Sequence, residues 1–268
     1  MLNQEVNNEI IRGDFQGKTS AELKGLYVKR NSLNVSPGEH IYRLFRIDYL
    51  LKDVKESTLS LVKVCPDSFD DPGENPLIDK KFMENGDEIL LGFLDCYYTL
   101  CWTDDPLDSR WRRDRFLRGR AGARVRVSLE KFMYQMMDER DRYFMLHCFA
   151  ARVEYRSDEA MQALLSSNDY SVHLDSLGQG GALAVSTVTD FLEEEREIRI
   201  VYSYERDNAF VAEQVRLEGN LCRIPFDWTN IIEEINFDES VSKQEYEKLL
   251  AQLRSHGINC PITLQPIE

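Results

Sequence analysis

The sequence lacks the cysteine and histidine patterns of a disulfide-rich or metal-binding protein. Its six cysteines are scattered, mostly inside apolar runs, and none form a Cys-x-x-Cys pair. It has only four histidines, and no two of them are spaced as a pair of metal ligands. We therefore expect reduced, mostly buried thiols instead of disulfides, and we expect no bound metal.

Long apolar runs and a secretory leader are also missing. No stretch approaches the roughly 20 apolar residues that a membrane-spanning helix needs. The first residues, Met1–Ile10, are polar and acidic, whereas a secretory signal has a basic start and an apolar centre. These absences predict a cytoplasmic protein with no membrane partner.

Positive charge is scarce overall but concentrated in one segment. The formal net charge of −14 argues against a general nucleic-acid binder. Residues Arg110–Arg126 nevertheless hold eight Arg and one Asp, a local +7, so the remainder carries −21. This arginine island is either an internal ion-pairing surface or a local anion site. Because its cations are all Arg, it favours bidentate recognition of carboxylate or phosphate.

Hydrophobic periodicity predicts an α+β protein, with a mixed, mostly antiparallel strand core flanked by helices. Residues 1–38 form a predicted accessory segment, with a helix after Thr19-Ser20, and residues 39–268 form one domain. Helices are expected over Asp48–Glu56, Glu130–Asp138 and Ser157–Leu165, after Ser109, and after the capping box of Ser242 and Glu245. Strands are expected over Ile41–Phe45, Thr58–Val64, Tyr97–Thr103, Ala123–Val127, Met145–Tyr155, Val211–Leu217, Leu221–Ile224 and Cys260–Ile267.

The candidate chemical centre is a further strand predicted over Glu195–Tyr204. Alternation places Ile198, Ile200 and Tyr202 on one face, with Glu195, Glu197 and Arg199 on the other. Neighbouring carboxylates repel unless a cation or a shared proton lies between them. The pattern fits either an exposed strand edge that faces water or a carboxylate pair in a cleft.

Six short motifs, taken in order, give the chain from about residue 40 onward a resemblance to a large bacterial family defined by a domain of unknown function. They are Tyr42-Arg43-Leu44-Phe45-Arg46, Phe69-Asp70-Asp71-Pro72-Gly73-Glu74, Cys101-Trp102-Thr103, Trp111, Val153-Glu154-Tyr155 and Glu195-Arg196-Glu197-Ile198-Arg199. The chain departs from the family pattern at Asp70, where asparagine is usual. It also departs around Leu192, where the family often has an aromatic residue and a lysine.

More remotely, the layout is similar to that of ADP-ribosyltransferases, which place a catalytic Glu on a late strand. The resemblance implies that NAD is the substrate and that Glu197 is the catalytic carboxylate that binds the ribose. It implies that Glu195 orients the acceptor and that Arg199 holds the two carboxylates in register. Arg43 or Arg46 would bind phosphate, Thr103 would support the ribose, and its neighbour Trp102 would also belong to the NAD site.

Three functions follow as hypotheses. The first is an NAD-dependent ADP-ribosyltransferase-like enzyme, a toxin or phage-defence effector that modifies a protein or nucleic-acid acceptor and has an antitoxin or other defence partner. The second is a non-catalytic regulatory module that binds a nucleotide or nucleic acid through the arginine island. The third is metal-dependent hydrolysis by Asp70, Asp71 and Glu74, although no matching His or Asp partner is apparent.

Overall fold

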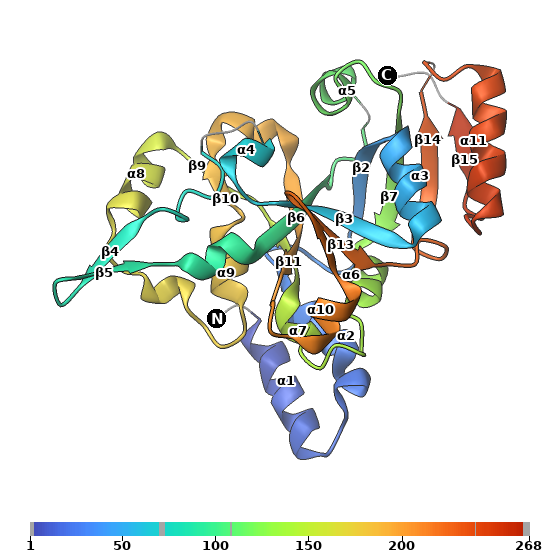
Figure 1. Ribbon diagram of the computed structural model, residues 1–268. Helices are drawn as coiled ribbons and strands as arrows, with labels where there is room; N and C mark the ends of the chain where they lie inside the picture. Colours follow the sequence, from blue (N-terminus) through green and yellow to red (C-terminus); the bar gives the residue numbers. More distant parts are fainter. Residues whose placement is uncertain (1–2, 70–72, 108, 239, 265–268) are drawn as a thin grey trace.

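The computed structural model describes residues 3–69, 73–107, 109–238 and 240–264, and it confirms the α+β class (Figure 1). Eleven strands form one mixed sheet. Its main path runs in the order β1 (Ser32–Leu33), β8 (Cys148–Arg152), β11 (Glu197–Ser203), β6 (Tyr97–Thr103), β2 (His40–Arg46), β7 (Gly122–Ser128), β14 (Ile232–Phe237) and β15 (Ile262–Leu264). A branch leaves β6 through β3 (Thr58–Lys63), β13 (Leu221–Pro225) and β12 (Arg216–Glu218). Within this sheet only β1 with β8 and β14 with β15 pair in parallel.

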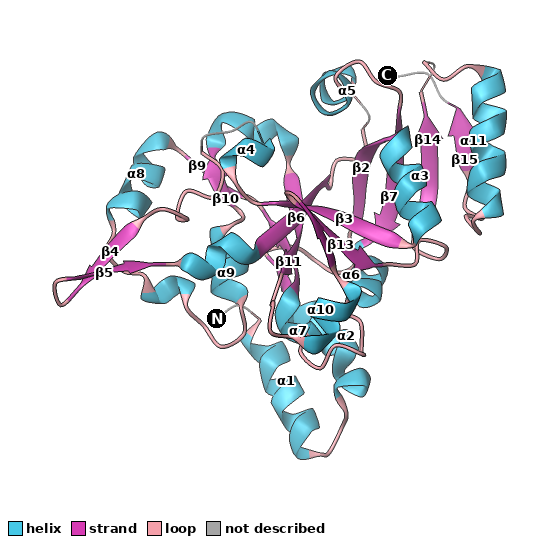
Figure 2. Ribbon diagram, in the orientation of Figure 1, coloured by secondary structure: helices cyan, strands magenta, loops and turns pink. Residues whose placement is uncertain are grey.

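Helices flank the sheet, as Figure 2 shows. They are α1 (Gln4–Phe15), α2 (Ser20–Arg30), α3 (Ile47–Glu56), α4 (Pro66–Phe69), α5 (Arg110–Leu117), α6 (Leu129–Met136), α7 (Phe144–His147), α8 (Asp158–Ser166), α9 (Gln179–Ala184), α10 (Ala209–Gln214) and α11 (Lys243–Ser255). Three 3-10 helices are η1 (Gly92–Cys96), η2 (Ser171–His173) and η3 (Asp190–Glu195). Two small sheets pair β4 (Lys81–Glu84) with β5 (Asp87–Leu90), and β9 (Glu154–Arg156) with β10 (Thr187–Thr189). No helix in the described ranges is long and apolar enough to cross a membrane.

The sheet branches at β6, and this branch point creates the cleft described below. Strand β3 pairs with the first half of β6, at Tyr98 and Thr99. Strand β2 pairs with β6 only at its far end, where Tyr42 lies opposite Thr103. Between these two pairings β6 has no strand partner on that edge, and the Arg43 side chain instead donates a hydrogen bond to the Cys101 carbonyl.

Alternation along β11 divides its side chains between two environments. Ile198, Ile200 and Tyr202 enter the main apolar cluster, which also contains Trp102 of β6. Val201, on the opposite face, joins a second cluster with buried side chains from β6, β8 and α9. The second cluster does not extend to the start of β11, so that face carries the polar side chains of the candidate site.

The N-terminal residues also contribute to the main cluster. Helix α2 begins after Thr19, which forms the reciprocal capping box with Glu22. Its Leu23, Tyr27 and Val28 are buried in the main cluster. The residues that follow form β1, which extends the sheet beside β8.

Three predicted strands were wrong in part. The segment Met145–Tyr155 begins in α7 and is then divided into β8 and β9. The segment Val211–Leu217 lies mostly in α10, whose N-cap Asn208 accepts hydrogen bonds from the Phe210 and Val211 amides. The predicted final strand is observed over Ile262–Leu264, and the part of it beyond Leu264 lies outside the described residues.

Candidate functional site

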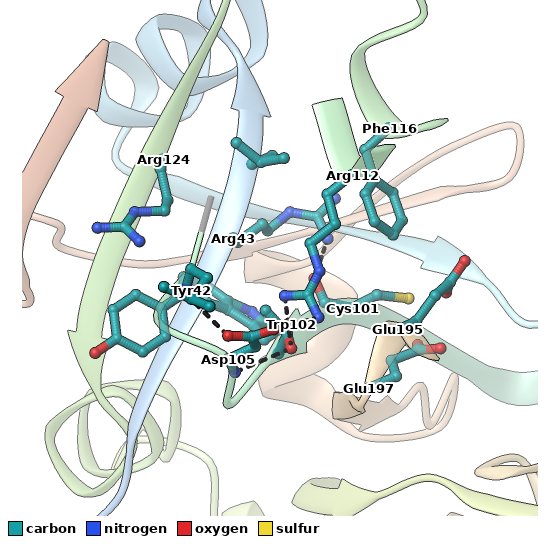
Figure 3. Close-up of a pocket in the computed structure, with 13 residues that line it drawn as sticks. Tyr42, Arg43, Cys101, Trp102, Asp105, Arg112, Phe116, Arg124, Glu195 and Glu197 are labelled. Atoms are coloured by element: carbon teal, nitrogen blue, oxygen red, sulfur yellow. Dashed lines mark hydrogen bonds and ion pairs between the residues drawn. The ribbon is translucent and has the colours of Figure 1, made fainter. Parts of the chain in front are cut away.

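A two-part cleft lies where β6 and β11 meet the branch in the sheet. Its two hollows span about 500 Å³ and 1060 Å³, including space that is open to solvent. Both are lined by Arg43, Cys101, Phe116, Glu195 and Glu197, so the hollows adjoin at these residues. Figure 3 shows the residues that line the first hollow.

The two glutamates reach this cleft from different elements. Glu197 is the first residue of β11 and lies opposite Thr103 of β6. Glu195 is the last residue of η3 and therefore does not lie on the strand, which corrects the sequence-based expectation. Arg196 adopts a left-handed conformation with φ 48° between them and ends the 3-10 helix. Glu195 and Glu197 are only 8% and 6% exposed, so neither faces open water.

Arg199 lies within a buried ion-pair network. Its Nε donates to Glu197 Oε1 at 2.9 Å, and its two terminal nitrogens donate to the carboxylate oxygens of Glu74. The Val185 carbonyl accepts a further hydrogen bond from Nη1 at 2.5 Å. Burial disfavours the cation, but Glu197 and Glu74 outweigh burial and raise the pKa of Arg199 well above its usual value. Arg199 therefore stays charged and fixes one oxygen of Glu197.

Glu195 has a different cationic partner. Nε of Arg115, on α5, donates to Glu195 Oε1 at 2.5 Å. Burial raises the pKa of Glu195 above its usual value, and nearby Glu197 raises it further, whereas Arg115 lowers it. The net direction is upward, which makes Glu195 a better proton acceptor near neutral pH than an exposed glutamate.

Arg43 lies inside the cleft, whereas Arg46 does not. Arg43 lines both hollows, and its Nε is buried without a hydrogen-bond partner. Among the residues that the structure describes, no carboxylate forms a salt bridge with Arg43. Arg46, at the end of β2, contacts Asp48 and Tyr49 at the surface. Of these two candidates for phosphate binding, only Arg43 is placed to contact a ligand in the cleft.

Thr103 lies in the first hollow with its hydroxyl held from two sides. Its Oγ1 accepts hydrogen bonds from Arg112 Nη1 and from the Asp105 amide, each at 3.2 Å. The hydroxyl hydrogen remains available to donate to a ligand. The ring of its neighbour Trp102 lies on the opposite face of β6, in contact with Phe45 and Phe132 of the core. Trp102 thus packs in the core with its ring and also lines the first hollow.

The arginine island is in part an ion-pairing surface that helps to build this cleft: Arg112 and Arg113 are buried, whereas Arg110, Arg115, Arg118 and Arg120 are exposed. Arg113 pairs with Asp238, and Arg126 pairs with Glu234. Arg112 pairs with Asp105 and also donates to the Glu194 carbonyl. Arg112 and Arg115 thus tie α5 to the segment that carries Glu195, and α5 borders the cleft.

Cys101 and Tyr155 are among the residues of the site that were not predicted from the sequence to contribute. Cys101 lies beside Glu197, and burial raises the pKa of its thiol well above the usual value, so the thiol stays protonated. Figure 3 shows its sulfur directed toward the two glutamates. The Tyr155 hydroxyl accepts a hydrogen bond from the Glu197 amide at 3.0 Å. The alternation of β6 could have identified Cys101, but no local pattern indicates the long-range contact of Tyr155.

The Phe69–Glu74 motif contributes both of its end residues to the second hollow. The Phe69 ring lies 5.4 Å from the Arg199 guanidinium carbon, and Glu74 binds Arg199. Asp70 and Asp71, which the hydrolytic hypothesis names together with Glu74, lie outside the described residues. In the described ranges no group of three His, Cys, Asp or Glu side chains is placed to hold a metal ion.

Comparisons with known proteins find structural neighbours only. No protein-family model and no curated protein matches the sequence. The structure is similar to Thermus sp. 2.9 DarT in complex with ADP-ribosylated ssDNA, with a TM-score of 0.37 and 12% identity, over 85% of this chain and 94% of that chain. DarT from the same source in complex with carba-NAD+ gives a TM-score of 0.34, with 12% identity over 85% and 96% of the two chains. Its complex with NAD+ gives 0.33, with 13% identity and the same coverage. These TM-scores are too low for the likeness to support a function.

Proposed function

We propose that this protein is an NAD-dependent ADP-ribosyltransferase. The observation that carries the proposal is the convergence of Glu195, Glu197, Arg43 and Thr103 on one cleft, although they come from three strands and a 3-10 helix. An exposed ion-pair ladder would leave the two glutamates in water, whereas here both are more than nine-tenths buried.

Each side chain has a role in the proposed reaction that follows from its surroundings. Glu197 binds the ribose hydroxyls and stabilises the positive charge that develops on the sugar, because a fixed carboxylate in a buried site is suited to an oxocarbenium-like centre. Arg43 binds the pyrophosphate, since it has no carboxylate partner within the described ranges. The Thr103 hydroxyl donates to the bound nucleotide, and Arg199 holds Glu197 in place.

In the proposed reaction, the bond between ribose C1′ and the nicotinamide nitrogen breaks, and nicotinamide leaves as a neutral molecule with the bonding electrons. An acceptor oxygen or nitrogen then bonds to C1′. Glu195 takes the proton that the acceptor loses, a role that fits its raised pKa. No metal enters this scheme.

The regulatory-module hypothesis is the second candidate, and it requires arginines of the island that are available for an external phosphate. Arg112, Arg113 and Arg115 each bind a carboxylate of this chain, whereas Arg124 lines the first hollow and donates to the Pro106 carbonyl instead. Phosphate binding that Arg124→Met removes, without nicotinamide release by the wild type, would favour this second candidate.

The first experiment is to follow nicotinamide release from NAD by the purified protein, with and without cell lysate, and to compare Glu197→Gln. The substitution keeps the shape of the side chain and removes its charge, so we expect release to fall by about 10²-fold or more with the fold retained. Glu193→Gln is the matched control, because Glu193 is an exposed residue of η3. Absence of release by the wild type, together with absence of NAD binding by calorimetry, would reject the proposed function.

We further propose that the activity serves a toxin or phage-defence effector in the cytoplasm, held in check by an antitoxin or other defence partner. Expression of the wild-type protein in a bacterial host should then arrest growth, and Glu197→Gln should relieve the arrest. If the wild-type enzyme is active in vitro but the host grows normally, the toxin or defence role is rejected and only the proposed transferase activity remains.

A further inference from the structure

Glu74 ends the Phe69–Glu74 motif, and the proposed reaction gives it no part. It is only 3% exposed, although it lies in the irregular chain that follows α4. Its carboxylate faces the two terminal nitrogens of Arg199, with one hydrogen bond of 3.0 Å from Nη2 to Oε2. The fork of the guanidinium thus faces Glu74, and only Nε faces Glu197.

This arrangement places one cation between two carboxylates. If Arg199 had Glu197 as its sole acidic partner, the guanidinium would neutralise the carboxylate that must stabilise a cationic sugar. With Glu74 on the other side of Arg199, the three groups together carry a net charge of −1. Glu197 then keeps an oxygen and a negative charge for the ligand, while its orientation is still fixed by Arg199 Nε.

We propose that Glu74 is a positioning residue for ADP-ribosyl transfer, which offsets the charge of Arg199 so that Glu197 faces the ribose as an effective anion. This inference rests on the proposed function. It assigns to the end of the Phe69–Glu74 motif an electrostatic role exerted through Arg199, without contact with NAD.

Several other groups face Glu197 and also determine the electrostatic potential at its carboxylate. They are Arg199 on its own strand, Cys101 on β6, Tyr155 on β9, Glu195 on η3 and Arg43 on β2. Cys101 and Tyr155 are neutral near neutral pH, because burial raises the pKa of each. Arg115 offsets the charge of Glu195. Glu74 is therefore the group whose neutralisation most directly changes how strongly Arg199 acts on Glu197.

The test compares Glu74→Gln, which keeps the shape of the side chain and loses its charge, with the wild type. We expect kcat for nicotinamide release to fall on the order of tenfold to a hundredfold, with little change in KM for NAD, since no NAD contact is removed. Glu74→Asp keeps the charge and shortens the side chain, so it should retain more of the wild-type kcat than Glu74→Gln. A loss of shape alone would affect Glu74→Asp more than Glu74→Gln.

Asp141→Asn is the matched control. Asp141 is also buried, and it accepts hydrogen bonds from Asn208 and the Tyr143 amide beside His147, away from both hollows. This variant should lose stability and keep the wild-type kcat per folded molecule. Wild-type kcat in Glu74→Gln would overturn the inference.

Where Glu74→Gln does not fold, Glu74→Asp is compared with the wild type alone, and a loss of kcat beyond tenfold in a variant that keeps the charge would contradict the inference. Failure of the proposed function would appear as absence of nicotinamide release by the wild type. Failure of the inference would instead leave the wild type active and Glu74→Gln equally active.

Discussion

At Glu195, burial and a neighbouring cation act in opposite directions on one carboxyl group. Burial raises the pKa, Arg115 lowers it, and the net direction is upward. If Glu195 takes the acceptor proton, activity is lost as the pH falls through this raised pKa, because only the ionised form is a base. The acidic limb of transfer should therefore lie at a higher pH than an exposed glutamate would give.

Arg115→Met should move that limb further. The substitution removes the hydrogen bond and the cation that lower the pKa of Glu195, so the limb for ADP-ribosyl transfer should shift to higher pH. The measurement is the pH profile of transfer to acceptor. Arg110→Met is the control, since Arg110 lies on the same helix with an 86% exposed side chain. Identical limbs in Arg115→Met and the wild type would mean that Glu195 is not the base.

The residue types of the site could be predicted from the sequence, but their geometry could be predicted only in part. Alternation correctly assigned Glu197 and Arg199 to one face of a strand. It also placed Glu195 on that strand, because it could not anticipate the left-handed turn at Arg196. The pairing of Glu74 with Arg199 spans 125 positions in the chain, and no local pattern carries such a contact.

At the scale of whole elements, strong local signals were reliable and weak ones were not. Strand β6 and helix α11 were predicted, because a run of apolar and aromatic residues in the first and a capping box in the second specify them locally. Helix α10 is rich in Ala, Glu and Gln, which favour helices, and the Asn208 cap starts the helix. The strand prediction over Val211–Leu217 did not take account of this cap.

Helix α5 illustrates how a polar element is held in place. Its Arg113 pairs with Asp238, which follows β14, and both side chains are less than one-tenth exposed. Arg113→Met leaves this buried carboxylate without its cation, so we expect a loss of about 3–5 kcal/mol in the free energy of unfolding. Urea denaturation measures this loss, and KM for NAD should rise because α5 also carries Arg112 and Arg115.

Arg216→Met provides the comparison for this prediction. Arg216 is 59% exposed, and it lies 3.8 Å from Glu56 in a surface ion pair. Its replacement should change the free energy of unfolding by no more than about 0.5 kcal/mol. Equal small losses in the two variants would show that the Arg113–Asp238 pair does not fix α5.

At the scale of the molecule, the branch in the sheet allows a ligand to bridge parts of the protein that do not otherwise pair. Between Thr99 and Thr103, β6 is bordered by the Arg43 side chain in place of a strand. NAD bound there should stabilise the whole folded chain, by about 2.7 kcal/mol at a concentration 100 times its Kd. The gain appears as a higher melting temperature.

Comparing Arg43→Met with Arg46→Met tests whether NAD binding needs a specific phosphate contact from Arg43 or only the positive charge of β2. Both are made in the Glu197→Gln background, so that NAD is not consumed while the protein is heated. Arg43→Met should lose most of the rise in melting temperature with NAD, because it removes the cleft guanidinium that has no carboxylate partner in the described ranges. Arg46→Met should keep the rise, since Arg46 contacts Asp48 and Tyr49 outside the cleft. If both variants lose the rise in melting temperature equally, NAD binding depends only on the overall charge of β2. The pyrophosphate would then have to bind elsewhere in the cleft.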